Sequence, residues 1–127
     1  MLLKMNQILG FPNFFEIVKS QKISFKTSYR LAMLAHEVEK HHNFYTEEFR
    51  KLIFEYGEKD AEGKLVPTED GNGVKLQQDK TEECYTKLNE LRELEIELPD
   101  CYFDLEDFDG IELTPMEVNV IIPFIKK

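Results

Sequence analysis

The chain has 127 residues, of which 42% are hydrophobic and 32% charged, and its net charge is −9. A chain of this length can bury a core without staples, so we expect one domain over residues 1–127. The negative charge repels phosphate and argues against direct binding of nucleic acid. No apolar run approaches the roughly 20 residues of a membrane span. Cys84 and Cys101 form no CxxC pair, which predicts reduced thiols in a cytosolic protein without a standard signal peptide.

The N-terminal half predicts a short strand, a short helix and then a long helix. Met1–Met5 suits the strand, and Pro12–Ser20 suits a helix with proline in its first turn. From about Thr27 to Tyr56, apolar residues recur at the three-and-four spacing of an amphipathic helix. Gly57 is its expected stop. A helix of that length needs a partner along its apolar stripe.

The segment DKTEECYTKLNELREL is the predicted partner of the long helix. Asp79 and Glu82 have the spacing of a capping box. The expected apolar face of this second helix consists of Cys84, Tyr85, Leu88 and Leu91. We therefore expect Lys80–Leu94 to pack antiparallel on Thr27–Tyr56, as a helical hairpin that forms the core.

The C-terminal third predicts a strand followed by a short helix. Leu94, Ile96 and Leu98 alternate with glutamates, which is the pattern of a half-buried strand. In LTPMEVNVIIPFI, Thr114, Pro115 and Glu117 are three agreeing signals for a helix start. Pro123 should end or kink that helix. The expected fold class is α+β and mostly α: a long antiparallel helical hairpin with a small β element and a short C-terminal helix.

The negative charge is concentrated in one segment near the C-terminus. Nine carboxylates without a lysine or arginine among them occupy it: Glu93, Glu95, Glu97, Asp100, Asp104, Glu106, Asp107, Asp109 and Glu112. Since the chain has 25 acidic residues, the 16 that remain match its 16 lysines and arginines. We consider these nine residues, the acidic segment, as candidates for binding a protein partner with a basic surface. The alternative is that they only solvate a strand and a loop.

Several motifs occur in an order that resembles a known family. They are FKTSYRLAMLAHEVEKHHNFYTEEFRKLIFEYGEKDAEGKL, then GNGVKL, LNELRELEIEL and GIELTPMEVNVIIPFI. From about Ile23 to the C-terminus the chain resembles a family of short proteins of unknown function from tailed phages and prophages of Gram-positive bacteria. The resemblance implies a phage-encoded protein in the host bacterial cytoplasm, and it supplies no catalytic residue, cofactor or metal.

The histidines do not predict a zinc site. In HEVEKHH, the two histidines of a metalloprotease helix would have to be four residues apart. His36 and His41 are five apart, which puts them about 140° apart around a helix. We expect His41 at the edge of the core with a hydrogen-bond partner, and His36 and His42 at the surface.

The stretch EYGEKDAEGKLVPTEDGNGVKL allows two interpretations. Aligned on a calcium-binding EF-hand loop, its candidate positions are Glu58, Asp60, Glu62, Gly63, Leu65 and Glu69. Pro67 stands at the tenth position, however, and DGNG follows where the exit helix should begin. The second interpretation, which we favour, is a turn-rich flap or loop over residues 57–78 that connects the two helices.

Two functions of different classes remain open. The first is a non-enzymatic phage accessory protein that acts through protein–protein contacts in assembly or in the late gene module. The second is an acidic inhibitor of a host defence enzyme, similar to an anti-CRISPR protein, whose carboxylates imitate a nucleic-acid backbone. Same-side carboxylates of a strand lie about 6.6 Å apart, against 3.4 Å per phosphate along one DNA strand. Mimicry would therefore need further groups from DLEDFDG.

Overall fold

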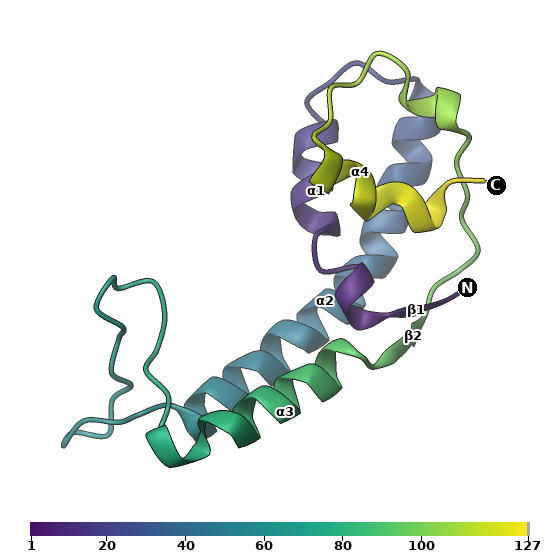
Figure 1. Ribbon diagram of the computed structural model, residues 1–127. Coiled ribbons are helices and arrows are strands. Elements are labelled where there is room, and N and C mark those ends of the chain that lie inside the picture. Colours follow the sequence, from purple (N-terminus) through teal and green to yellow (C-terminus); the bar gives the residue numbers. More distant parts are fainter. Residues whose placement is uncertain (127) are drawn as a thin grey trace. The chain divides into compact units, whose positions relative to one another are not determined.

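A computed structural model describes residues 1–126 of the chain (Figure 1). Its contacts divide the chain into two compact units. Unit 1 consists of Met1–His42 and the chain from Glu95 onward, and unit 2 is Asn43–Leu94. The long helix α2, Phe25–Tyr56, contributes residues to both units. A mostly helical α+β fold is confirmed, with a long helix, a two-stranded sheet and a short C-terminal helix.

Unit 1 combines short elements from both ends of the sequence with the first part of α2. In chain order these elements are β1 Leu2–Lys4, η1 Met5–Gln7, α1 Phe11–Val18, β2 Glu95–Glu97, η3 Leu105–Phe108, α4 Pro115–Ile121 and η4 Ile122–Phe124, where η marks a 3-10 helix. Strands β1 and β2 pair antiparallel, with Leu3 opposite Ile96. Phe103 forms a parallel bridge with Ile125, and its N–H donates to the Phe124 carbonyl at 2.7 Å.

The core of unit 1 is built around five phenylalanines. Phe11, Phe14, Phe103, Phe108 and Phe124 are buried, and their ring centroids lie 5.5–6.3 Å apart in successive pairs. The rings come from α1, η3, η4 and the segment after β2. Tilted and edge-to-face ring pairs add to the burial free energy. This cluster therefore joins segments that are about a hundred residues apart in the sequence.

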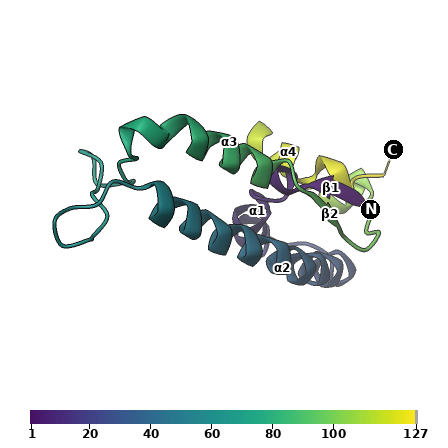
Figure 2. The ribbon, with the colours of Figure 1, turned by 90° about the horizontal axis from the view of Figure 1, so that it is seen from below.

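Unit 2 is an antiparallel helical hairpin. The second part of α2 runs beside α3, Thr81–Arg92 (Figure 2). The Tyr56 hydroxyl donates to Glu83 Oε1 at 3.0 Å, and Arg92 Nε donates to the Tyr45 hydroxyl at 3.4 Å. Tyr56, at the end of α2, therefore contacts the start of α3, and Tyr45, earlier in α2, contacts the end of α3. The two helices run in opposite directions.

The segment between the two helices of the hairpin folds back on itself through isolated backbone bridges. These bridges join Gly57 to Leu76, Lys59 to Leu65, and Pro67 to Val74. Two turns close them, with Gly63 at φ 81° and Gly71 at φ 75°, values that glycine adopts without steric cost. The predicted turn-rich connection over residues 57–78 is present, and no helix follows Glu69 before residue 78.

Local signals at the start of α4 and at the end of α2 are confirmed. Thr114 Oγ1 accepts from the Glu117 N–H, and Glu117 Oε1 accepts from the Thr114 N–H, so the predicted capping box of α4 is confirmed. The α-helix ends at Ile121 and continues as the 3-10 turn that contains Pro123. Helix α2 ends before Gly57, where a Cβ atom would lie 2.5 Å from the Ile53 carbonyl oxygen.

Three details of the predicted hairpin were wrong. The N-cap of α3 is Lys80 and no side chain caps it, because Asp79 belongs to a preceding 3-10 turn, Gln78–Lys80. Tyr85 is 56% exposed and lies outside the apolar face. Leu94, which was expected to be buried at the start of the strand, is exposed and precedes β2. Glu93 is the C-cap of α3, and the Leu94 N–H donates to the Leu91 carbonyl, so Leu94 still belongs to the end of that helix.

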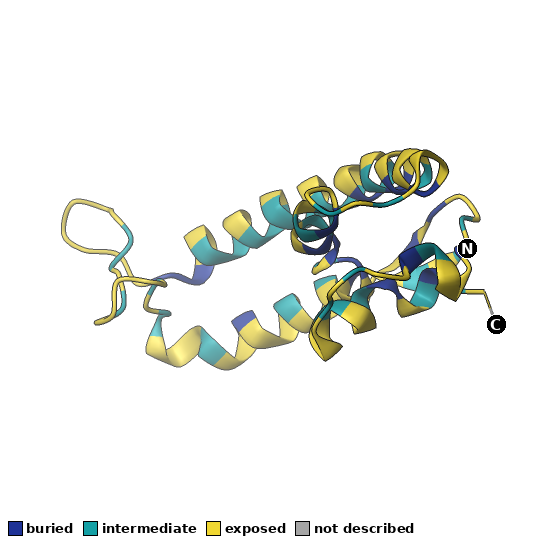
Figure 3. Cartoon of the chain, turned by 90° about the horizontal axis from the view of Figure 1, so that it is seen from above, coloured by how far each residue is buried: buried dark blue, intermediate teal, exposed yellow. Residues whose placement is uncertain are grey.

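The largest buried set does not lie in the hairpin, contrary to our expectation. Figure 3 shows buried residues along the elements of unit 1, whereas α3 is mostly exposed. In unit 2 only Tyr56, Gly57 and Cys84 are buried. The reason is that the short apolar segments at the two ends of the chain pack on the first part of α2 and shield Leu31, Leu34 and other residues there.

Candidate functional site

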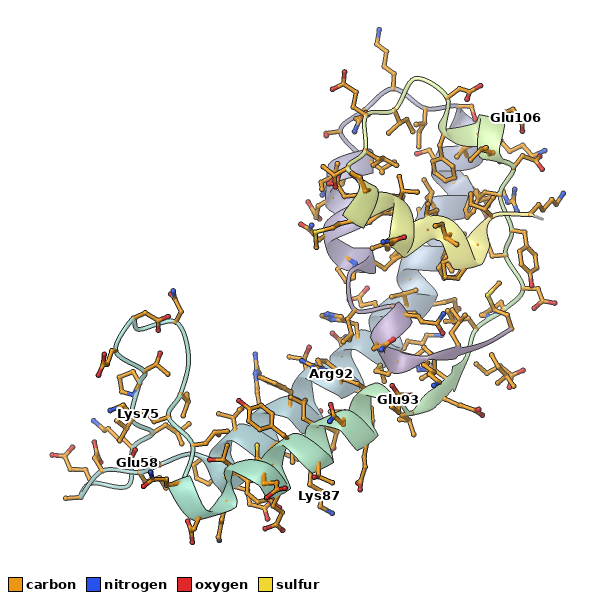
Figure 4. All side chains as sticks on the ribbon, viewed as in Figure 1. Glu58, Lys75, Lys87, Arg92, Glu93 and Glu106 are labelled. Atoms are coloured by element: carbon orange, nitrogen blue, oxygen red, sulfur yellow. The ribbon has the colours of Figure 1, made fainter. Side chains whose placement is uncertain are left out.

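The structure separates the nine residues of the acidic segment into two groups. Four have interactions: Glu93, Asp100, Asp104 and Asp107. Five have side chains that form no ion pair within residues 1–126: Glu95, Glu97, Glu106, Asp109 and Glu112. Figure 4 labels one member of each group, Glu93 at the end of α3 and Glu106 on η3. We call the five residues the open carboxylates.

Strand β2 presents two of the open carboxylates on one face. Glu95 and Glu97 are both exposed, whereas Ile96 between them is 4% exposed and points to the opposite side. Side chains alternate along a strand, so these two carboxylates are neighbours on the solvent side. Pairing with β1 and burial of Ile96 hold the strand in place.

The loop after β2 uses two of its carboxylates for its own structure. Asp104 and Asp107 form a capping box on η3, and Asp107 Oδ2 accepts from the Asp104 N–H at 2.9 Å. Lys126 Nζ lies 3.9 Å from Asp104 Oδ1. Asp100 Oδ1 accepts from the Met1 amino group at 2.8 Å. These groups stabilise local backbone and are poor candidates for contacts with a partner.

Arg30 of α2 fixes the segment between β2 and η3. Its guanidinium donates to the Tyr102 carbonyl oxygen and lies 4.8 Å from the centre of the Phe103 ring. A guanidinium over an aromatic face is attracted by the ring quadrupole. We did not single out Arg30 from the sequence, because its partners are more than seventy residues away.

The histidine positions agree with the sequence interpretation for two of the three residues. His41 is half-buried, and its Nε2–H donates to the Glu97 carbonyl oxygen at 3.1 Å, so the expected core-edge position and hydrogen bond are confirmed. His36 is exposed as predicted. His42 is half-buried rather than at the surface, and it lines a hollow between α1 and α2 together with His36.

The candidate calcium-binding stretch of unit 2 uses its aspartates to hold turns. Asp60 Oδ1 accepts from the Glu62 N–H at 2.9 Å and from the Lys64 N–H at 3.0 Å. Figure 4 shows Glu58 and Lys75 close together in this segment, where the Glu58 N–H donates to the Lys75 carbonyl at 2.7 Å. Over the described residues, no group of three or more histidine, cysteine or acidic side chains is arranged to hold a metal ion.

The two cysteines have different surroundings. Cys84 is buried, and this burial raises the pKa of its thiol. Burial also raises the pKa of Cys101, while the nearby Arg30 guanidinium opposes that change. A thiol with a raised pKa is a weak nucleophile at neutral pH. Neither cysteine is therefore activated for covalent chemistry.

Comparisons with protein-family models, with curated proteins and with solved structures found no match to this chain. Within residues 1–126, no helix is both long enough and apolar enough to cross a bilayer. The candidate site therefore rests on geometry alone: the exposed face of β2 with Glu95 and Glu97, and the further open carboxylates of the loop that follows.

Proposed function

We propose that this chain is a non-enzymatic accessory protein, encoded by a tailed phage or prophage, that acts in the host bacterial cytoplasm through protein–protein contacts in assembly or in the late gene module. Its partner presents a basic surface to the open carboxylates. The observation that carries the proposal is that Glu95 and Glu97 are exposed on one face of β2 and that neither forms an ion pair within residues 1–126, although Lys4 of β1 stands opposite Glu95.

The energetics favour a binding role for these carboxylates. Like charges that are close together repel one another, and nearby lysines relieve that repulsion. Lys4 stands opposite Glu95 in the sheet, whereas Glu97 has Leu2 opposite it. A basic partner relieves it as well, and the strand that carries the charges is already ordered by β1. Little conformational entropy is then lost on binding. Complementary charges of this kind mainly accelerate association.

A second function, inhibition of a host defence enzyme by imitation of nucleic acid, is supported by the same two neighbouring carboxylates. This second function is less well supported than the first, because two of the carboxylates that it needs are engaged within the chain. Mimicry needs a longer row of charges, and Asp104 and Asp107, which would extend the row, are engaged in the capping box of η3. The further negative charges of such a row would have to come from Glu106 and Asp109, which are exposed.

The test begins with capture of partners by the full chain from phage-infected Gram-positive cells. Binding of the recovered partner is then measured at low and high salt for the wild type and for a variant with Glu95→Gln, Glu97→Gln and Glu106→Gln. We expect slower association and a flatter salt dependence for this variant. The matched control removes three exposed carboxylates elsewhere, with Glu58→Gln, Glu69→Gln and Glu90→Gln, and should bind like the wild type.

The outcome also separates the two functions. A phage protein as partner, with no effect on DNA binding by host enzymes, supports the accessory role. A host enzyme that releases nucleic acid on binding this chain supports inhibition. If both triple variants bind with the affinity and salt dependence of the wild type, the open carboxylates only solvate the surface, and the proposal is wrong.

A further inference from the structure

Asn72 lies in an exposed turn of unit 2 and is followed by glycine. The turn spans residues 68–73 in the segment between α2 and α3 (Figure 1), and the backbone bridge between Pro67 and Val74 closes it. Asn72 and Gly73 are both exposed, and no residue of the turn is buried. We call residues 68–73 the Asn72 turn.

An asparagine that precedes glycine can react with its own backbone. The Gly73 backbone nitrogen attacks the side-chain amide carbon Cγ of Asn72, a C–N bond forms, and the side-chain nitrogen leaves as ammonia. Water then opens the resulting succinimide ring at one of its two carbonyl carbons, which gives aspartate or isoaspartate. No group is oxidised or reduced, and water is the only co-reactant. Glycine favours ring closure because it has no Cβ atom and its backbone rotates freely.

The other five asparagines of the chain are poorly placed for this reaction. Their backbone N–H and C=O groups belong to helices, whose fixed dihedral angles hold the next backbone nitrogen away from the side-chain carbon. None of them is followed by glycine. They are Asn6 in η1, Asn13 in α1, Asn43 in α2, Asn89 in α3 and Asn119 in α4.

The folded turn restrains the nitrogen that would attack. The Gly73 N–H donates to Thr68 Oγ1 at 3.2 Å, and the Gly73 carbonyl accepts from the Thr68 N–H at 3.0 Å. The Asn72 N–H donates to Asp70 Oδ1 at 3.1 Å, and the Thr68 hydroxyl donates to the same oxygen. Since ring closure turns the Gly73 peptide group toward the Asn72 side chain, these hydrogen bonds have to open first.

We propose that Asn72 is a site of spontaneous deamidation, and that Thr68 sets the rate by holding the Gly73 N–H in the closed turn. Local opening is easiest where few apolar contacts are buried, and the Asn72 turn has no buried residue that would keep it shut. Deamidation therefore proceeds from the native chain, through brief opening of this turn.

The product changes both the charge and the backbone of the turn. A carboxylate replaces a neutral amide, so the chain gains one negative charge beyond its −9. Isoaspartate also carries the backbone through its side chain, which adds one carbon to the path between Thr68 and Gly73. The hydrogen bonds between those two residues then lose their spacing. This modification does not depend on the proposed function or on the open carboxylates.

Ageing of the full chain at mildly alkaline pH tests the proposal. The mass of the peptide that contains Asn72 reports its deamidation, and electron-transfer fragmentation distinguishes isoaspartate from aspartate. We expect Asn72 to deamidate before any of the five helical asparagines, which serve as internal controls. The same chain unfolded in guanidinium chloride should deamidate at Asn72 at least about fivefold faster, because one hydrogen bond that restrains Gly73 corresponds to about that factor in rate.

Substitutions at the two ends of the turn test the role of each partner. Thr68→Val removes the acceptor of the Gly73 N–H and should accelerate deamidation about fivefold, whereas Thr68→Ser keeps the hydroxyl and should age like the wild type. Gly73→Ala restricts the attacking nitrogen and should slow the reaction at least about fivefold. A Cβ atom at Gly73 would lie 3.7 Å from Thr68 Cγ2, an ordinary contact, and Gly73 has no positive φ. The turn should therefore keep its fold in Gly73→Ala.

The double variant with Thr68→Val and Gly73→Ala shows whether the acceleration passes through the Gly73 nitrogen. It should deamidate at least about fivefold more slowly than Thr68→Val alone. Circular dichroism of each variant confirms that the helices on both sides of the turn remain folded.

Three results would overturn the proposal. The first is a folded chain in which Asn72 stays intact while the unfolded chain deamidates, since the closed turn would then block the reaction. The second is a helical asparagine that deamidates as fast as Asn72 in the folded chain. The third is an equal rate in the wild type, Thr68→Val and Thr68→Ser, which would mean that Thr68 does not restrain the Gly73 nitrogen.

Discussion

Unit 2 should open at lower free energy than unit 1. Unit 2 buries only Tyr56, Gly57 and Cys84, and its hairpin relies on half-buried contacts such as those of Leu52 and Leu88. Unit 1 has the phenylalanine cluster and buried aliphatic residues from five elements. Local opening is easiest where few apolar contacts are buried. We therefore expect amides in α3 to exchange at least about a hundredfold faster than those in α1, a difference of about 2.8 kcal/mol.

Two leucine substitutions, one in each unit, test this difference in local stability. Leu→Ala in a packed core costs about 2–5 kcal/mol. Leu34 is 3% exposed, so Leu34→Ala should cost unit 1 about 3 kcal/mol. Leu88 is half-buried, and Leu88→Ala should cost unit 2 about half as much, on the order of 1.5 kcal/mol. That loss corresponds to about tenfold faster exchange.

Hydrogen exchange followed by mass spectrometry measures both effects. Peptides from α3 should lose protection in Leu88→Ala, while peptides from α1 keep theirs. Peptides from α1 should lose protection in Leu34→Ala. Equal protection of α1 and α3 in the wild type, or an equal loss of protection in both helices on Leu88→Ala, would mean that the two units unfold together and that buried area does not decide which opens first.

Three further predictions concern single features. Thr114→Ala removes the N-cap of α4 and should lower the free energy of unfolding by about 1 kcal/mol, measured by urea titration, with Thr114→Ser nearly neutral. Calorimetry should detect no micromolar calcium binding, and tight binding that Asp60→Ala and Glu69→Ala abolish would restore the EF-hand interpretation. Burial raises the pKa of the Tyr56 hydroxyl, helped by Glu83, and burial raises the pKa of the Cys84 thiol. Both groups lose protons more readily when unfolded, so stability should fall as the pH rises through the unfolded values near 9 and 10, and a flat urea midpoint from pH 8 to pH 11 would contradict this.

The features that the sequence predicted correctly are those that depend on a few adjacent residues. The capping box of α4 involves Thr114 and Glu117, and the end of α2 involves Gly57 and the turn before it. The same local logic could have identified the capping box of Asp104 and Asp107. Its three-residue spacing is visible in DLED, where the carboxylates on either side make the segment look like a uniform run of charge.

The features that the sequence could not predict depend on contacts between distant residues. Ile96 is buried because Leu3, more than ninety residues away, pairs opposite it. Phe103 belongs to the core because it bridges to Ile125 and because Arg30 covers its ring. Periodicity identifies an apolar face but not its partner. Phe25, Tyr29 and Met33 of α2 show the same limit, since their four-residue spacing is visible in the sequence and their exposure is not.

Salt shows whether the open carboxylates drive binding. Attraction between Glu95, Glu97 and a basic partner is screened beyond about 8 Å at physiological ionic strength, so added salt should slow that association. Burial of apolar side chains does not weaken with added salt, and sulfate should strengthen it. A salt series on capture of the partner therefore distinguishes the two forces. If added salt leaves capture unchanged or strengthens it, the open carboxylates do not drive binding, and an apolar surface does.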